Sequence, residues 1–143
     1  MNMNDIRIIA EKVRKSCEKF ANSDASKDYD FHNSNCLSCM CAVASFTLAT
    51  ALRQNGIQCD VVKGYFYDNG DEIQGDHCWV EIGPDIVDIT VTQFYPNWQK
   101  VYITQKGSRN YRDGVVKNDY QHFKSWLCQN PTPAVTKKIL QCA

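Results

Sequence analysis

The chain has 143 residues, and its 16 basic and 16 acidic side chains give a formal net charge of zero. A chain of this length folds as one domain and buries roughly two thirds of its unfolded surface. We therefore expect a single domain over residues 1–143. The balanced charge shows no electrostatic footprint for nucleic acid, so we expect no nucleic-acid partner.

No stretch of the chain reaches the roughly 18 apolar residues of a membrane-spanning helix, and we expect no membrane partner. Charged residues interrupt the apolar positions of residues 1–19, which therefore lack the continuous apolar core of a signal peptide. We expect a cytoplasmic protein, with delivery by a leaderless route left open. In a reducing compartment the eight cysteines should mostly be free thiols.

The first half of the chain predicts two helices separated by a loop. Residues 4–21 place apolar side chains at helical spacing, with Asn4 as the expected cap. Residues 22–35 are polar and rich in turn formers, which predicts a loop. Residues 38–55 predict a second helix that ends at Gly56, where a left-handed cap forms easily. Its interior is apolar or small on nearly every side, so we expect it to be central and buried.

After the second helix the apolar pattern changes from helical to alternating. Residues 58–67 predict one strand and residues 68–75 a turn region. Residues 76–82 and 86–91 predict a hairpin across residues 83–85.

The last third of the chain completes an α+β architecture. Residues 100–104 predict a strand, residues 106–114 a loop, residues 118–129 a helix, and residues 133–142 a short terminal helix. The helices largely precede an antiparallel sheet, and we expect the buried central helix to pack on it.

Cys41 stands in the first turn of the second helix if Ser38 is the N-cap. Free N–H groups and the helix dipole at this position stabilise a thiolate. Together with a nearby histidine cation they lower a cysteine pKa from about 8.5 to roughly 3.5–7.5. The same N–H groups can form half of an oxyanion hole. Cys41 is therefore the candidate nucleophile.

Alternation in the hairpin places His77 and Asp88 on one face. The opposite face is entirely apolar and consists of Cys78, Val80, Ile82, Val87, Ile89 and Val91. If Ile82 pairs with Asp85, Asp88 lies diagonal to His77 at about 7–8 Å. A slip of one residue would send His77 and Asp88 to opposite faces. A cysteine, a histidine and a carboxylate that orients the histidine are the parts of a cysteine nucleophile site.

Two further residues are candidates for binding substrate or an oxyanion. Asn35 lies just before the helix and could donate from its side-chain amide, although its ordinary role would be a turn or a helix cap. Trp79 follows His77 on the same face and could form a wall of the site, with sheet packing as the alternative.

Cys36 and Cys39 form a CxxC motif, which raises the possibility of a metal site. Structural zinc takes four ligands, typically from two such pairs. The chain has no second CxxC and no closely spaced pair of histidines, so we expect no metal and no cofactor. Whether Cys36 and Cys39 hold a metal or a disulfide stays open, and Cys39 is the alternative nucleophile if the helix register differs.

Residues 41–94 combine the cysteine that opens the central helix with Ser45, Leu48, Leu52, Arg53, Gly56 and Ile57, then with the strings VVKGY, HCWVE, VDIT and TQF. This combination resembles the core of the transglutaminase-like, papain-related cysteine enzymes. The resemblance implies that Cys41 is the nucleophile, His77 the general base and acid, and Asp88 the orienter of His77. The separation between His77 and Asp88 looks shorter than in many members.

The resemblance implies a thiol-dependent enzyme that acts on an amide bond of a protein or peptide substrate through a thioester. An amide hydrolase, a protease and a protein-glutamine deamidase share this chemistry. The alternatives are transglutaminase-type cross-linking by a lysine amine and a catalytically inactive peptide-binding module of the same fold. A zinc- or redox-linked interaction protein that uses Cys36, Cys39 and Cys41 is the rival from another class.

Overall fold

A five-stranded antiparallel sheet and three α-helices make up the parts of the chain that the computed structural model describes, which are residues 2–34, 36–126 and 129–142. The helices are α1 (Met3–Ala21), α2 (Cys41–Gln54) and α3 (Pro133–Leu140). The strands are β1 (Asp60–Asp68), β2 (Asp71–Ile82), β3 (Asp85–Asp88), β4 (Tyr102–Gln105) and β5 (Tyr111–Val116). Their order in the sheet is β4-β3-β2-β1-β5. The predicted α+β class is confirmed.

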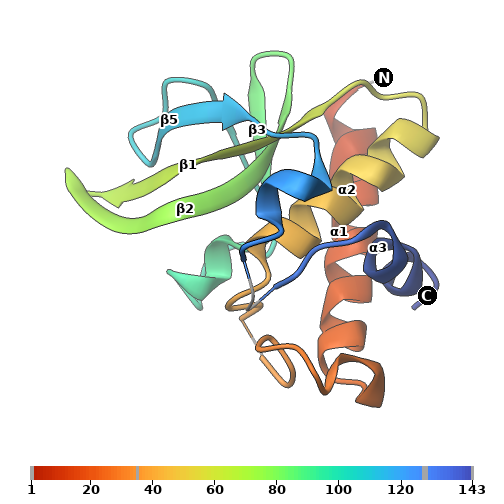
Figure 1. Cartoon of the computed structure of the whole chain (residues 1–143). Coiled ribbons are helices and arrows are strands. Elements are labelled where there is room, and N and C mark those ends of the chain that lie inside the picture. Colours follow the sequence, from red (N-terminus) through yellow and green to blue (C-terminus); the bar gives the residue numbers. More distant parts are fainter. Residues whose placement is uncertain (1, 35, 127–128, 143) are drawn as a thin grey trace.

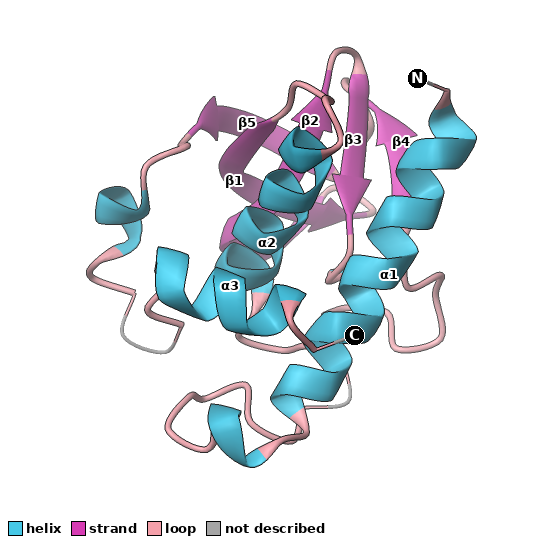
Figure 2. Ribbon diagram, turned by 90° about the vertical axis from the view of Figure 1, so that its right-hand side faces the viewer, coloured by secondary structure: helices cyan, strands magenta, loops and turns pink. Residues whose placement is uncertain are grey.

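Helix α2 is the centre of the fold. It packs on β2, and both α1 and α3 pack on α2 (Figure 1, Figure 2). Side chains on every side of α2 are buried, and Ala42, Leu48 and Leu52 have no exposed surface. The helix stops where Gly56 takes a φ of 77°, which glycine adopts without steric cost. A buried central helix that ends at this glycine is therefore confirmed.

The described helices include none that is both long enough and apolar enough to pass through a membrane.

Helix α1 is amphipathic, as predicted, but its cap differs from the expected one. It buries Ile6, Ala10, Val13, Cys17 and Phe20 at helical spacing. The Asn2 side chain, and not that of Asn4, accepts a hydrogen bond from the Asp5 N–H at 3.0 Å. The prediction of Asn4 was wrong because the helix begins at Met3, so that Asn4 already lies in its first turn.

The start of α2 also differs from the prediction. Leu37 and Cys39 have φ values of 55° and 61°, and left-handed residues cannot continue a right-handed helix. The helix therefore begins at Cys41, with Met40 as a cap residue that makes no side-chain hydrogen bond. Ser38 was wrongly expected to be the cap.

The β1–β2 hairpin has a shorter turn than residues 68–75 suggested. Only Asn69 and Gly70 form it, with φ values of 50° and 86°. Two left-handed residues suit a tight turn whose twist matches the flanking strands. Residues 71–75 belong to β2 instead. Their polarity reflects exposure along the strand, which the sequence pattern alone could not distinguish from a loop.

The predicted register of the β2–β3 hairpin is confirmed. Ile82 pairs with Asp85, and Val80 pairs with Val87. Four members of the predicted apolar face, Cys78, Val80, Val87 and Ile89, lie in the core that the sheet shares with the helices. Val91 was wrongly placed on this face. The strand ends at Asp88, and Val91 begins a 3-10 turn that packs against the other face.

That other face of the sheet carries a second apolar cluster around Trp79. Its buried members are Val62, Phe66, Trp79, Ile86, Val91 and Tyr111. The indole lies so close to the backbone of β1 that a Cβ on Gly64 would be 2.5 Å from the ring. Glycine at this position therefore makes room for the buried tryptophan.

The C-terminal third contains the largest differences from the sequence prediction. Strand β4 lies close to the predicted residues 100–104, but β5 covers half of the predicted loop at residues 106–114. An exposed edge strand has no apolar alternation, and β5 buries only its first residue. Of the helix predicted over residues 118–129, the described part contains only a 3-10 turn, Tyr120–Phe123, and residues 127–128 lie outside the described residues. The terminal helix is confirmed as α3.

We predict that Gly64→Ala destabilises the fold by about 1–3 kcal/mol, because the added methyl overpacks the tryptophan site. Urea unfolding followed by tryptophan fluorescence measures the change. Gly75→Ala is the matched control, because a Cβ there would be 3.5 Å from the nearest side chain. Equal unfolding midpoints for the two variants would contradict the packing argument.

Candidate active site

Cys41 opens α2 and lines a cavity of about 300 Å³ between the helix, the β1–β2 hairpin and the C-terminal segment. Cys41 is only slightly accessible, with 5% of the residue exposed. The other lining residues are Cys39, Gln74, Asp76, Gln93, Trp126 and Gln129. A small opening of this kind restricts access to a protruding or extended group.

His77 and Asp88 form a buried hydrogen-bonded pair. The His77 Nε2 and Asp88 Oδ2 atoms are 2.8 Å apart, and both residues have at most 1% of their surface exposed. Asp88 Oδ2 also accepts a hydrogen bond from the Tyr111 hydroxyl at 2.7 Å, and Oδ1 accepts one from the Thr90 N–H at 2.8 Å. The hairpin therefore brings the histidine and the carboxylate together on one face, as predicted.

The pair keeps both partners in their charged forms. Burial by itself raises the pKa of Asp88, but the His77 charge and the surrounding donors outweigh it and leave this pKa below its ordinary value. Burial by itself lowers the pKa of His77, but the Asp88 carboxylate and the Cys41 sulfur raise it to about 10. The imidazole is therefore protonated at neutral pH, which fits the assignment of a donor N–H on Nε2.

A β-bulge next to His77 sets the position of the imidazole. Gly64 pairs with His77 and Phe66 with Gln74, so two residues of β2 lie opposite one residue of β1. Asp76, within the bulge, has a φ of 56°. A bulge bends the strand and redirects the side chains beside it. This irregularity had no signal in the alternating pattern.

The second ring nitrogen of His77 is the one available to the Cys41 sulfur. Nε2 is occupied by Asp88, whereas Nδ1 is buried and has no hydrogen-bond partner among the described residues. The Cys41 sulfur and the imidazole are nevertheless close enough for each to stabilise the charged form of the other. Contacts of this kind are often long in an unliganded site and shorten when substrate binds.

The Cys41 pKa lies well below its ordinary value. The largest cause is a hydrogen bond from the Cys78 thiol, which acts together with the His77 charge and a Gln129 hydrogen bond against the cost of burial. Burial and the Cys41 charge raise the pKa of Cys78 well above its ordinary value, so Cys78 stays protonated as a donor. The sequence analysis treated Cys78 only as part of the apolar face and missed this contact.

Gln129 is the second residue that the sequence analysis missed. Its Oε1 accepts hydrogen bonds from the N–H groups of Ala42 at 2.7 Å and Val43 at 3.2 Å. Its Nε2 donates to the Cys41 sulfur at 3.4 Å. Two of the helix N–H groups that were expected to serve an oxyanion are therefore already engaged. No local motif marks Gln129, because its partners lie in a distant part of the chain.

The loop that follows Asp88 is anchored to helix α1 by Arg14. The Arg14 guanidinium is buried and donates to the Ile89 carbonyl and the Thr92 hydroxyl, both at 2.8 Å. The Thr92 hydroxyl in turn donates to the Cys36 carbonyl at 3.2 Å, in the segment before α2. This chain of hydrogen bonds ties the segment before Cys41 to the segment after Asp88.

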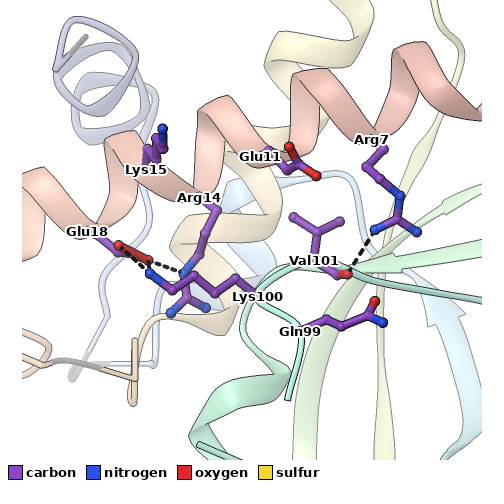
Figure 3. A pocket seen from close by; sticks show the side chains of 8 residues that line it. All are labelled: Arg7, Glu11, Arg14, Lys15, Glu18, Gln99, Lys100 and Val101. Carbon is purple, nitrogen blue, oxygen red and sulfur yellow. Dashed lines mark hydrogen bonds and ion pairs between the residues drawn. The ribbon is translucent and has the colours of Figure 1, made fainter. Parts of the chain in front are cut away.

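Glu18 completes the anchor on the opposite side of the guanidinium. It accepts from Arg14 Nε at 2.7 Å and from Lys100, as Figure 3 shows. The three residues line a separate cavity of about 550 Å³ between α1 and residues 99–101. Glu18 thus holds the Arg14 guanidinium, which in turn holds the loop after β3.

Asn35 and Trp79 were the other two residues expected to bind substrate or an oxyanion. Asn35 lies outside the described residues. Trp79 packs beside His77 with a ring-centroid distance of 5.9 Å, and its indole N–H donates to Glu81 at 3.0 Å. Because Trp79 is buried and its N–H is already engaged, its contacts support sheet packing and not substrate binding.

The cysteines of the CxxC motif take no part in a cluster of metal ligands. Across residues 2–34, 36–126 and 129–142, no group of three or more histidine, cysteine or acidic residues is arranged to hold a metal ion. The seven cysteines in these ranges are free thiols. Cys39 is exposed and lines the Cys41 cavity, whereas Cys36 is half-buried.

Comparisons with protein-family models, with curated proteins and with solved structures found no match. The similarity of residues 41–94 to the transglutaminase-like enzymes therefore stays a prediction.

We predict that Asp88→Asn slows alkylation of Cys41 by iodoacetamide about tenfold or more at about pH 6. A rise of about one unit in the Cys41 pKa reduces the thiolate fraction about tenfold at a pH below that pKa. Without the carboxylate, the pKa of His77 falls and the imidazolium no longer stabilises the thiolate. Labelling followed by mass spectrometry measures the rate.

Tyr111→Phe is the matched control, since it removes one donor to Asp88 and keeps the carboxylate. We expect a smaller loss for this variant. If Cys41 in the Asp88→Asn variant were alkylated at the wild-type rate, the carboxylate would have no influence on Cys41.

Proposed function

We propose that the protein is a thiol-dependent enzyme that acts on an amide bond of a protein or peptide, with Cys41 as nucleophile, His77 as general acid and base, and Asp88 as the group that orients His77. One observation carries the proposal. A buried imidazole lies between a carboxylate at 2.8 Å and a cysteine at the start of a helix. The order of the three residues along α2, β2 and β3 also fits a papain- and transglutaminase-like core.

In the first half of the reaction the Cys41 thiolate attacks the carbonyl carbon of the amide. The carbon–nitrogen bond then breaks as His77 gives its proton to the leaving nitrogen, which departs as an amine or as ammonia. The product on the protein is a thioester. In the second half, neutral His77 takes a proton from water, the hydroxide attacks the thioester, and the carboxylic product leaves as the thiolate reforms.

The surroundings of the pair suit this sequence of steps. Asp88 holds the positive imidazolium in the resting state, and Cys78 donates to the negative sulfur. Both charges therefore exist before substrate arrives, in a buried site where their interactions are stronger than in water. A thiolate formed in advance needs no separate deprotonation step.

The shape of the cavity supports a protein or peptide substrate. Only a small part of Cys41 is exposed, at the bottom of an opening walled by the half-exposed ring of Trp126 and by the polar side chains of Gln74 and Gln93. A protruding side-chain amide fits such an opening. The cross-linking enzymes accept the same amide but need a lysine amine as second substrate, whereas hydrolysis and deamidation need only water, and we favour an amide hydrolase or protein-glutamine deamidase.

We predict that iodoacetamide labels Cys41 selectively between about pH 5 and 8, because thiolate is the reactive form. Cys39 is the internal reference, since it is exposed in the same cavity. His77→Ala should slow the labelling of Cys41 and leave that of Cys39 unchanged. If Cys41 in the wild-type protein reacts no faster than Cys39 at low pH, the site is a catalytically inactive binding module.

Turnover should show an alkaline limit that labelling lacks. The imidazolium persists below its raised pKa of about 10 and is lost above it, so protonation of the leaving nitrogen fails at higher pH while alkylation of the thiolate continues.

The assay incubates unfolded casein with the wild-type protein and with Cys41→Ser. Ammonia release indicates deamidation, new amino termini indicate proteolysis, and incorporation of an added primary amine indicates cross-linking.

The absence of all three products, with selective labelling of Cys41 intact, would limit the activity to a substrate unlike casein. Equal product formation by Cys41→Ser would exclude Cys41 as the nucleophile.

A further inference from the structure

We propose that Gln129 is a further catalytic residue of this site, whose side-chain N–H donates to the Cys41 sulfur while its carbonyl oxygen caps helix α2. The inference rests on the proposed function, because it concerns the same nucleophile. It adds the C-terminal segment to a site that the hairpin and α2 otherwise form.

The hydrogen bonds of Gln129 fix which end of its amide faces the sulfur. The side chain is buried, with 3% of the residue exposed. The atom that receives the Ala42 and Val43 N–H groups has to be the oxygen, because an amide nitrogen cannot accept them. The nitrogen therefore points at Cys41, where its distance to the sulfur is 3.4 Å. A donor at this position stabilises the thiolate more than the thiol.

Helix α2 depends on this oxygen for its cap. Met40, the residue at the cap position, has no side-chain oxygen and makes no capping hydrogen bond. Ser38 is unavailable because the left-handed Cys39 separates it from the helix. Gln129 thus does the work of a local cap from a position far along the chain, and the same side chain contacts the reacting atom.

The contact with the Cys41 sulfur explains why residue 129 is a glutamine and not a glutamate. The positive end of a helix dipole favours an acidic side chain, so glutamate would cap α2 at least as well as glutamine. Its second oxygen, however, would face the Cys41 thiolate and repel it. An amide is the group that accepts from the helix and donates to the sulfur at once.

Gln129 also lines the cavity above Cys41, together with Trp126. The backbone N–H of Gln129 donates to the Trp126 carbonyl at 3.0 Å. The segment that follows is held by α3, which is capped by Thr132 and packs on α2. The position of the donor is therefore tied to the same helix that carries the nucleophile.

The test separates the two roles of Gln129 with two substitutions. Gln129→Glu keeps the cap and removes the donor, whereas Gln129→Ala removes both. The pH dependence of iodoacetamide labelling at Cys41 reports the donor, and urea unfolding reports the cap. Gln74→Glu is the matched control, because Gln74 lines the same cavity and bonds to the Gly75 carbonyl, not to the sulfur.

We expect Gln129→Glu to move the labelling curve to higher pH by about one unit, which slows labelling about tenfold at low pH, with an unfolding midpoint at or above that of the wild-type protein. Gln129→Ala should shift the curve and also unfold at lower urea. Gln74→Glu adds the same charge to the cavity but removes no donor to the sulfur, so its labelling curve should shift clearly less than that of Gln129→Glu.

Three results would overturn the inference: an unchanged labelling curve in Gln129→Glu, an equal shift in Gln74→Glu, or a Gln129→Glu protein less stable than Gln129→Ala. A wild-type Cys41 with the labelling profile of an ordinary thiol would instead overturn the proposed function, so the two failures are distinguishable.

Discussion

The buried hydrogen bond between His77 and Asp88 is the interaction on which the site depends. Removing two charges from water is costly, and their attraction repays that cost only when the remaining polar atoms are also satisfied. Here Thr90 and Tyr111 donate to the carboxylate at 2.8 and 2.7 Å. With the carboxylate so held, the imidazolium keeps its charge, and that charge in turn supports a thiolate at Cys41.

The fold places these groups by several independent constraints. The hairpin register sets the shared face, and the bulge at Asp76 bends the strand next to His77. Arg14 holds the loop after β3 through the Ile89 carbonyl and Thr92. Each constraint acts on a different segment, so the precision of the site comes from their combination and not from any single element.

The sulfur receives donors from two separate parts of the chain. Cys78 belongs to the same strand as His77 but to its opposite face, and Gln129 belongs to the C-terminal segment. A buried thiolate without such partners would be too costly to form. Their presence around one cysteine distinguishes Cys41 from Cys17, whose pKa burial raises to about 12.

The sequence by itself determined the buried helix that Cys41 opens and the hairpin face that His77 and Asp88 share, because helical and alternating periodicity are local properties of the chain. It did not reveal the cap of α2, the edge strand β5 or the donors Cys78 and Gln129. Those features arise from contacts between residues far apart in sequence, such as the hydrogen bond from the Ala42 N–H to Gln129. Only the packed structure decides which distant polar groups meet, since no periodic pattern encodes them.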